Sequence, residues 1–220
     1  MRALLVGDTG GIGAAIADEL TDRGVKVVGL SRSVDGLDVT DETSVRDIIS
    51  AQDGPFHRII VTTGALVSTT ARPEKSIREV GADEMAAQHR VNAIGPMLVL
   101  KYVLPLISKD APSVFAALSA RVGSIGDNHL GGWHSYRASK AALNQYLHGA
   151  SIELRRSHPN LTVAALHPGT VATPFTEAYA QSHDRVPPQT AARNLVTLVE
   201  SLTPNDSGGF FDYSGKSIPW

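Results

Sequence analysis

The chain has 220 residues, of which 42% are hydrophobic and 19% are charged, and its formal net charge is −2 at pH 7. This balance argues against a nucleic-acid partner, because a nucleic-acid-binding surface normally carries a basic excess. The absence of cysteine excludes disulfides and thiolate metal sites. No cluster of His and carboxylate residues has metal-ligand spacing either, so we expect no metal.

The N-terminus shows no signal-peptide pattern. The most apolar later stretch, residues 96–107, contains a lysine and a second proline and is too short to span a bilayer. No linker or low-complexity segment divides the sequence. We therefore expect one domain over residues 1–220, located in the cytoplasm, with no membrane partner.

Short apolar runs alternate with longer helical patterns along the chain. The runs lack the alternation of a half-exposed strand, and we interpret them as buried strands at 3–6, 25–30, 59–61, 113–118 and 161–166, with a last short strand at 210–212. Helices are expected at about 11–23, 41–51, 83–107, 135–157 and 189–202. This order predicts an α/β fold, a single-domain Rossmann-type doubly wound parallel sheet with helices on both faces.

One connection is too short for this scheme. After the second strand the chain reads SRSVDGLDVTD, and only a few residues separate Ser31 from Asp38. A parallel crossover needs a dozen or more residues. We therefore expect a loop here, with the helix after the second strand missing and the third strand vestigial.

A glycine-rich turn follows the first strand, in VGDTGGIGAAIADEL. Gly7, Gly11 and Gly13 let the backbone turn sharply and approach a pyrophosphate, while the next helix directs its N-terminal N–H groups at the anion. This spacing favours a dinucleotide site. The alternative is a tight strand-to-helix turn that binds no ligand.

The end of the second strand should meet the adenosine ribose. An acidic residue there would accept hydrogen bonds from a 2′-hydroxyl and repel a 2′-phosphate, but the sequence has Ser31 and Arg32 instead. An arginine can pair with a phosphate through its guanidinium group. NADP is therefore favoured over NAD, with a solvated surface arginine as the alternative.

Tyr136 and Lys140 are four residues apart at the start of a predicted helix, which places them on one face. A nearby ammonium group favours the phenolate and lowers the tyrosine pKa from about 10. Such a tyrosine can exchange protons near neutral pH.

The glycine turn together with Tyr136 and Lys140 resembles the short-chain dehydrogenase/reductase family over essentially the whole chain. LSARVGSIGDN, GGWHSYRASKAALN and the ending GKSIPW resemble its C-factor-like subgroup. The resemblance implies that Tyr136 exchanges a proton with a small carbonyl or alcohol substrate as hydride passes to or from nicotinamide. It also implies that Lys140 holds the nicotinamide ribose and lowers the tyrosine pKa, and that Asn92 and a serine complete the catalytic set.

Matching motif positions imply the cofactor contacts. Asp38-Val39 fits the family's adenine contact, Thr62-Thr63-Gly64 replaces its usual N-A-G, and residues 167–173 fit the P-G-x-V-x-T segment near the nicotinamide. The expected cofactor-binding residues are Gly7, Thr9, Gly11, Ile12, Gly13, Ser31, Arg32, Asp38, Val39, Thr63, Gly64, Tyr136, Lys140, Pro168, Gly169, Val171 and Thr173.

The substrate-binding serine is ambiguous. Family members usually carry two serines in a row at the end of this strand, the second being catalytic, whereas here Ser119 is followed by Ala120. Ser119 lies 17 residues before Tyr136, and Ser124 lies 12 residues before it, closer to the usual spacing. We favour Ser119 and keep Ser124 as the alternative.

Pro96 lies four residues after Asn92, inside the helix expected at 83–107. A proline cannot donate to the carbonyl four residues back, so we expect a kink there and an Asn92 carbonyl free of its usual partner. In the family, the matching carbonyl holds a water that contacts the active-site lysine. The resemblance thus implies a proton relay, with a kink that only improves packing as the alternative.

The resemblance also implies a variable substrate lid at about 174–190. Relatives commonly pair through two long helices, here about 83–107 and 135–157, which implies a homodimer or homotetramer. The alternative function is a dinucleotide-binding redox sensor or signalling protein with little turnover. Intact Asn92, Tyr136 and Lys140 argue against a sensor, and the missing second serine keeps it open.

Overall fold

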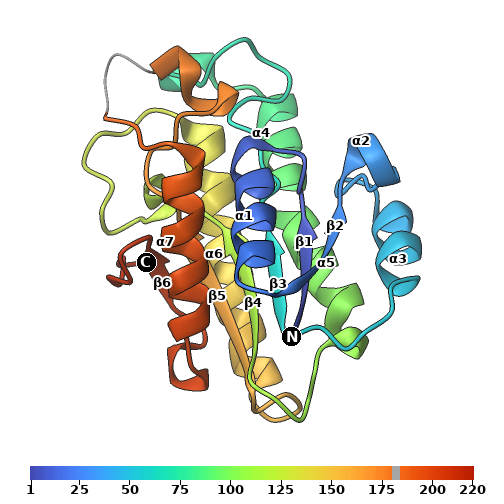
Figure 1. The fold of residues 1–220 in the computed structure, drawn as a ribbon. Helices are drawn as coiled ribbons and strands as arrows, with labels where there is room; N and C mark the ends of the chain where they lie inside the picture. Colours follow the sequence, from blue (N-terminus) through green and yellow to red (C-terminus); the bar gives the residue numbers. More distant parts are fainter. Residues whose placement is uncertain (180–183) are drawn as a thin grey trace.

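The computed structural model describes residues 1–179 and 184–220. Its strands are β1 Arg2–Val6, β2 Lys26–Leu30, β3 Arg58–Val61, β4 Ser113–Leu118, β5 Leu161–His167 and β6 Phe210–Asp212. They form one sheet in the order β2-β1-β3-β4-β5-β6, and every neighbouring pair is parallel. Figure 1 shows this sheet between two layers of helices.

The helices alternate with the strands along the chain. They are α1 Gly11–Asp22, α2 Arg32–Asp35, α3 Glu42–Ser50, α4 Ala82–His89, α5 Gly95–Val103, α6 His134–Leu154 and α7 Pro188–Ser201. Shorter helical turns are η1 Ile77–Glu79, η2 Arg90–Ile94, η3 Leu104–Leu106, η4 Arg121–Gly123, η5 Pro174–Tyr179 and η6 Pro204–Asp206. None of the helices in the described part of the chain is long and apolar enough to cross a membrane.

Helices cover both faces because successive strand residues point to opposite sides. Leu4 and Val6 of β1 pack in a core with α3, α5 and α6, whereas Leu5 packs in a second core with α1 and α7. Phe115 in β4 is 0% exposed, and truncating such a residue to alanine typically costs about 3–5 kcal/mol. The predicted doubly wound parallel α/β sheet is therefore confirmed.

The connection after β2 differs from the expected loop with a vestigial third strand. Residues Arg32–Asp35 form α2, a single helical turn that ends at Gly36 in a left-handed conformation with φ of 73°. Between α2 and α3 the chain forms no strand. A full crossover helix is missing, as expected, but one turn fits because it needs only about four residues.

The helix expected at 83–107 is helical throughout but contains different kinds of turn. Between α4 and α5, residues Arg90–Ile94 form a π turn in which the Gly95 N–H donates to the Arg90 carbonyl, five residues back. Pro96 then lies in the first turn of α5, where a proline is tolerated because its N–H would have no helical partner. In place of the kink expected at Pro96, the helix therefore has a wide turn just before this residue.

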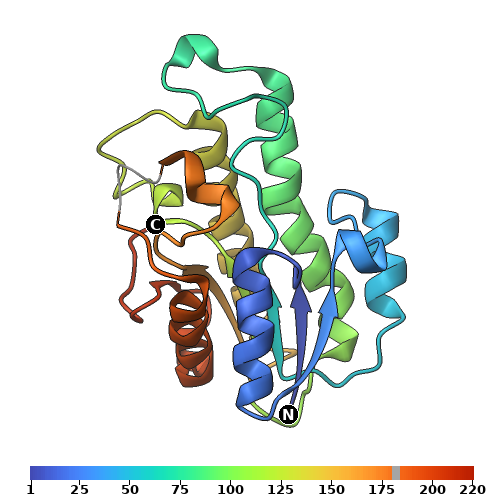
Figure 2. The same ribbon diagram turned by 45° about the horizontal axis from the view of Figure 1, so that its top comes forward.

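The carboxyl ends of all six strands meet at one edge of the sheet, which Figure 2 brings forward. The chain leaves β1 for β2 on one side and returns to β3 on the other. Connections of opposite direction leave a crevice between β1 and β3, where ligands bind in open α/β sheets.

Candidate active site

A cavity of about 770 Å³ lies at this edge of the sheet. Its wall consists of the glycine turn before α1, the ends of β3 and β4, the start of α6 and the segment after β5. Most of the residues expected from the sequence belong to this wall, namely Thr9, Gly11, Ile12, Gly13, Thr63, Gly64, Ser119, Tyr136, Lys140, Pro168, Gly169, Val171 and Thr173. Gly7, Ser31, Arg32, Asp38, Val39 and Asn92 lie outside the wall.

The glycine turn has the tight geometry that its sequence implies. Gly7 has a φ of 93°, in the left-handed region that favours glycine. A Cβ on Gly13 would lie 2.1 Å from the Gly7 carbonyl oxygen, and a Cβ on Gly11 would lie 2.9 Å from Cγ2 of Thr173. Helix α1 has no acidic residue in its first turn, so its N-terminal N–H groups are available to an anion.

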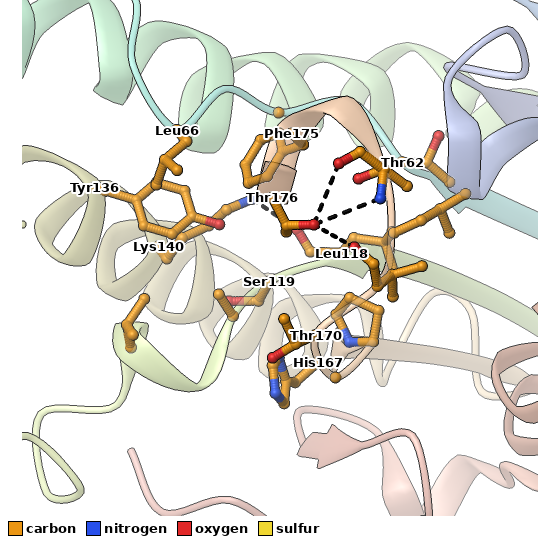
Figure 3. Close-up of a pocket in the computed structure, with 18 of the residues that line it drawn as sticks. Thr62, Leu66, Leu118, Ser119, Tyr136, Lys140, His167, Thr170, Phe175 and Thr176 are labelled. Atoms are coloured by element: carbon orange, nitrogen blue, oxygen red, sulfur yellow. Dashed lines mark hydrogen bonds between the residues drawn. The ribbon is translucent and has the colours of Figure 1, made fainter. Parts of the chain in front are cut away.

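Tyr136 and Lys140 lie one turn apart on α6 and are 6% and 3% exposed. The Lys140 Nζ atom donates to the Leu118 carbonyl at the end of β4, at 2.8 Å, and lies 5.9 Å from the Tyr136 ring centroid. Figure 3 shows both side chains beside Ser119, with Leu66 and Phe175 nearby. The two residues that the spacing predicts on one helix face therefore share one buried site.

The protonation of this pair differs from the expectation. Burial raises the pKa of Tyr136 above its ordinary value, and burial lowers the pKa of Lys140 to about 7. The expected lowering of the tyrosine pKa by Lys140 is not found, because both groups are buried and desolvation disfavours both charged forms.

Asn92 is fully buried behind the cavity wall. Its side chain accepts a hydrogen bond from the Ala65 N–H at 2.9 Å and donates to the Ala65 carbonyl at 2.8 Å. A Cβ on Gly64 would lie 3.1 Å from Asn92 Oδ1 and 3.4 Å from Lys140 Nζ. The side chain of Asn92 thus holds the segment after β3 next to Lys140.

The structure separates the two candidate serines. Ser119 belongs to the cavity wall, and its hydroxyl donates to Asn144 Oδ1 on α6 at 2.7 Å. Ser124 lies outside the wall, where its hydroxyl donates to the Pro219 carbonyl. Ser119 therefore stays the better candidate, although its O–H group already donates to Asn144.

The end of β2 contains a carboxylate that the sequence interpretation missed. Asp35 in α2 accepts a hydrogen bond from the Ser31 N–H at 2.7 Å. The interpretation assumed a loop, in which residues four apart need not meet, whereas one helical turn brings them together. Arg32 beside it is exposed, and Asp38 accepts hydrogen bonds from Thr40 that lower the Asp38 pKa.

Two further aromatic residues of the wall are Trp133 and His167. The Trp133 and Tyr136 ring centroids are 6.2 Å apart, so Trp133 borders the tyrosine. His167 at the end of β5 has a buried Nδ1 atom with no hydrogen-bond partner in the described residues. Burial, with a contribution from Arg121, lowers the pKa of His167 to about 4 despite the nearby Asp212. His167 is therefore neutral at physiological pH.

The fold and this cavity define a Rossmann-type dinucleotide-binding protein. A family model described as Enoyl-(Acyl carrier protein) reductase matches residues 30–209. The 1-hydroxy-2-glutathionyl-2-methyl-3-butene dehydrogenase of Rhodococcus sp. (strain AD45) is 32% identical to this chain. The alignment is 235 positions long and covers 99% of this chain and 98% of that protein. The chain belongs to the short-chain dehydrogenase/reductase family.

Other matches agree with this assignment. The C-signal protein of Myxococcus xanthus is 34% identical over 145 residues, which cover 66% of this chain and 84% of that protein. This match confirms the resemblance to the C-factor-like subgroup. The structure of NADPH-bound carbonyl reductase from chicken fatty liver has the same fold, with a TM-score of 0.82, 22% identity, and coverage of 100% of this chain and 94% of that chain.

The depressed pKa of His167 predicts a pH dependence of stability. Between pH 6.5 and 4 the unfolded chain binds a proton at His167 that the folded chain does not, so the free energy of unfolding falls as the pH is lowered through this range. His167→Gln should remove up to about 3 kcal/mol of this fall. Urea denaturation at several pH values measures it.

The control is His129→Gln, at an exposed position on the loop before α6. It should keep the wild-type dependence on pH. Parallel curves for wild type and His167→Gln would contradict the burial of a neutral imidazole at this site.

Proposed function

We propose that this protein is an NADP-dependent oxidoreductase that transfers hydride between nicotinamide and a small carbonyl or alcohol substrate. The observation that carries the proposal is the joint burial of Tyr136 and Lys140 in the wall of a cavity that also contains the glycine turn. We further propose that residues 1–220 act as one domain and that the protein works in the cytoplasm.

The residues around the cavity fit a dinucleotide. The glycine turn and the start of α1 would hold the pyrophosphate, and the absence of a side chain at Gly13 lets α1 begin directly against the Gly7 carbonyl. Thr63 in the wall has a buried hydroxyl oxygen without a hydrogen-bond partner in the described residues, an acceptor or donor for a bound group. We assign Lys140 to the nicotinamide ribose and Pro168–Thr173 to the nicotinamide itself. When bound, the reduced nicotinamide supplies the hydride.

Tyr136 provides the proton in the proposed reduction. Its hydroxyl donates to the substrate oxygen, which becomes a hydroxyl as the carbon receives the hydride, and oxidation runs in reverse. Burial keeps Tyr136 protonated at neutral pH, which suits a proton donor. Lys140, with a pKa of about 7, can be charged at the same pH, and its ammonium group would stabilise the phenolate left behind.

Asn92 and Ser119 have supporting roles in the proposal. The Ser119 oxygen can still accept a hydrogen bond, although its O–H group donates to Asn144. The Asn92 main-chain carbonyl lies within the π turn and would hold the relay water beside Lys140. The side chain of Asn92 meanwhile keeps Gly64 next to that lysine.

The substrate end of the cavity is apolar. Leu66, Trp133 and Phe175 contribute to its wall, and the Phe175 and Tyr136 ring centroids are 6.2 Å apart. This lining supports a substrate with an apolar body. We also propose that residues 174–190 act as a lid, since Phe175 in η5 is 41% exposed at the cavity edge. Residues 180–183 of that lid lie outside the described part of the chain.

The choice of NADP depends on Arg32. The chicken carbonyl reductase that shares this fold binds NADPH, and Arg32 is the second residue after the strand end where a 2′-phosphate would lie. Asp35 opposes this preference, because a carboxylate at the end of β2 repels a 2′-phosphate. The hydrogen bond from the Ser31 N–H holds the Asp35 carboxylate at this place.

One observation favours the alternative function, a dinucleotide-binding redox sensor or signalling protein with little turnover. Ala120 stands where relatives usually have the catalytic serine, and the Ser119 hydroxyl donates its hydrogen bond to Asn144. A substrate oxygen would then receive a hydrogen bond from Tyr136 but none from a serine. In a slow enzyme, the small turnover that remains would depend on Tyr136. In a sensor, it would not.

Tyr136→Phe tests the proposed chemistry. The variant lacks the proton donor and should lose at least about 1000-fold in turnover, within the range for a general acid. Its binding of NADPH should stay within twofold of wild type, because the ring is retained. Nicotinamide absorbance over a panel of apolar carbonyl and alcohol compounds measures turnover, and fluorescence titration measures binding.

The matched control for Tyr136→Phe is Tyr146→Phe, on the same helix. The Tyr146 hydroxyl contacts His89 Nε2 at 3.1 Å, outside the cavity. Its removal should leave turnover unchanged. Equal turnover by Tyr136→Phe and wild type would refute the proton-donor role, and silence of wild type over the whole panel would favour the sensor.

Charge changes at the end of β2 test the preference for NADP. Arg32→Ala removes the cation assigned to the 2′-phosphate and should weaken NADPH binding about tenfold or more, while changing NADH binding less than twofold. Asp35→Asn should act in the opposite direction and strengthen NADPH binding. Titrations with both nucleotides measure these effects, and an equal loss of both nucleotides in Arg32→Ala would remove this residue from the phosphate site.

We propose a homodimer or homotetramer that pairs through α4, α5 and α6. A shallow groove lies between α4 and α6, where Met85 is 44% exposed and Ala138 is also exposed. Apolar side chains on this face support pairing between copies. Light scattering should give at least twice the mass of one chain, and Ala138→Glu should lower it towards one chain. A monomeric wild type would contradict the proposal.

A further inference from the structure

Three polar side chains form a row behind the cavity wall. Glu84, Gln88 and Asn92 are spaced by four residues along α4 and the π turn, and they are 3%, 0% and 0% exposed. Burying polar groups of this kind is unfavourable unless they are hydrogen-bonded. In the sequence, Glu84 and Gln88 look like ordinary polar residues of a surface helix, so their burial needs a reason.

Each member of the row is bonded to the next. Gln88 Nε2 donates to Glu84 Oε1 at 2.8 Å, and Asn92 Nδ2 donates to Gln88 Oε1 at 2.6 Å. At the first end, Glu84 also accepts from the Ser68 and Thr69 N–H groups and from the Thr69 hydroxyl. At the other end, the Asn92 side chain accepts a hydrogen bond from the Ala65 N–H and donates one to the Ala65 carbonyl.

The direction of these bonds is set by the charge of Glu84. Although burial opposes ionisation, hydrogen bonds from Gln88, Thr69 and Ser68 lower the pKa of Glu84 to about 2. An ionised carboxylate can only accept. Gln88 must therefore present its NH₂ group to Glu84 and its oxygen to Asn92, and Asn92 must in turn present its NH₂ group to Gln88. Asn92 Oδ1 is left to accept the Ala65 N–H.

The row of hydrogen-bonded side chains also determines part of the cavity wall. The bonds at the two ends of the row hold residues 65–69, and Leu66 in that segment belongs to the cavity wall. Gly64, directly before this segment, lies where an added Cβ would be close to both Asn92 Oδ1 and Lys140 Nζ. Asn92 Nδ2 also lies 3.1 Å from the Ser139 hydroxyl, which donates to the Tyr136 carbonyl. The row therefore connects the segment after β3 with α6 at the Tyr136–Lys140 pair.

We propose that Glu84 and Gln88 are positioning residues for catalysis, which act through Asn92 to fix the segment 64–69 against Lys140 and the substrate end of the cavity. Their effect on turnover rests on the proposed function. Their effect on the order of the segment does not, so the two can be tested separately.

Gln88→Met is the sharpest test, because methionine has a similar shape but transmits no hydrogen bond. Residue 88 has no hydrogen bond to Ala65, yet we expect the Ala65 N–H to exchange with solvent deuterium at least tenfold faster in the variant. We also expect kcat to fall at least tenfold, with NADPH binding changed less than threefold. Exchange is read by NMR, and the kinetic constants come from nicotinamide absorbance.

Glu84→Gln gives an independent test of the charge. A neutral amide offers one acceptor oxygen in place of two, so it cannot keep both the Ser68 and Thr69 N–H groups and also fix the direction of Gln88. It should reproduce the faster Ala65 exchange and the lower kcat. If Gln88→Met does not fold, this variant keeps the shape of the side chain and decides the question.

Gln145→Met is the matched control, since Gln145 is exposed on α6. It should leave exchange and kcat unchanged. A loss of thermal stability with normal Ala65 exchange and normal kcat would overturn the proposal and make the row a packing feature. If wild type turns over no substrate, the exchange result still decides the coupling, and the failure belongs to the proposed function.

Discussion

The hydrogen bond from Lys140 to the Leu118 carbonyl is the contact on which the arrangement of the site depends. It joins the end of the central strand β4 to the helix that carries Tyr136, and it places an amine where only 3% of the residue is exposed. Burying an isolated ammonium group is costly, and a lysine can avoid this cost by losing its proton. A pKa of about 7 is the result of that balance.

The surroundings of Lys140 are polar on one side and closely packed on the other. A Cβ on Gly123 would lie 2.8 Å from the Lys140 Cβ, and Gly64 faces its Nζ atom, so two glycines leave the space that the lysine occupies. Asn92 and the residues bonded to it provide oriented amides within the same region. The site therefore combines a buried amine with neighbours that hydrogen bonds and close packing hold in place.

Much of this arrangement could be predicted from the sequence. Buried strands such as β4 have continuous apolar runs, and the Tyr136–Lys140 spacing fixes a shared helix face whatever surrounds it. The turn α2 was missed because four residues carry no periodic pattern. The row that begins at Glu84 was missed because its partner segment, 65–69, has no signal of its own. The pKa directions depend on burial, which a sequence pattern does not measure.

The π turn at Arg90–Ile94 means that this part of the helix contains one extra residue. Such a turn is an α-helix with one residue more than regular winding needs. In a regular helix Pro96 would lie in the interior, where it cannot donate to the Asn92 carbonyl. The wide turn instead puts this proline into the first turn of α5. The same extra residue therefore lets one continuous helical segment contain both the proline and Asn92, whose side chain bonds the backbone of Ala65.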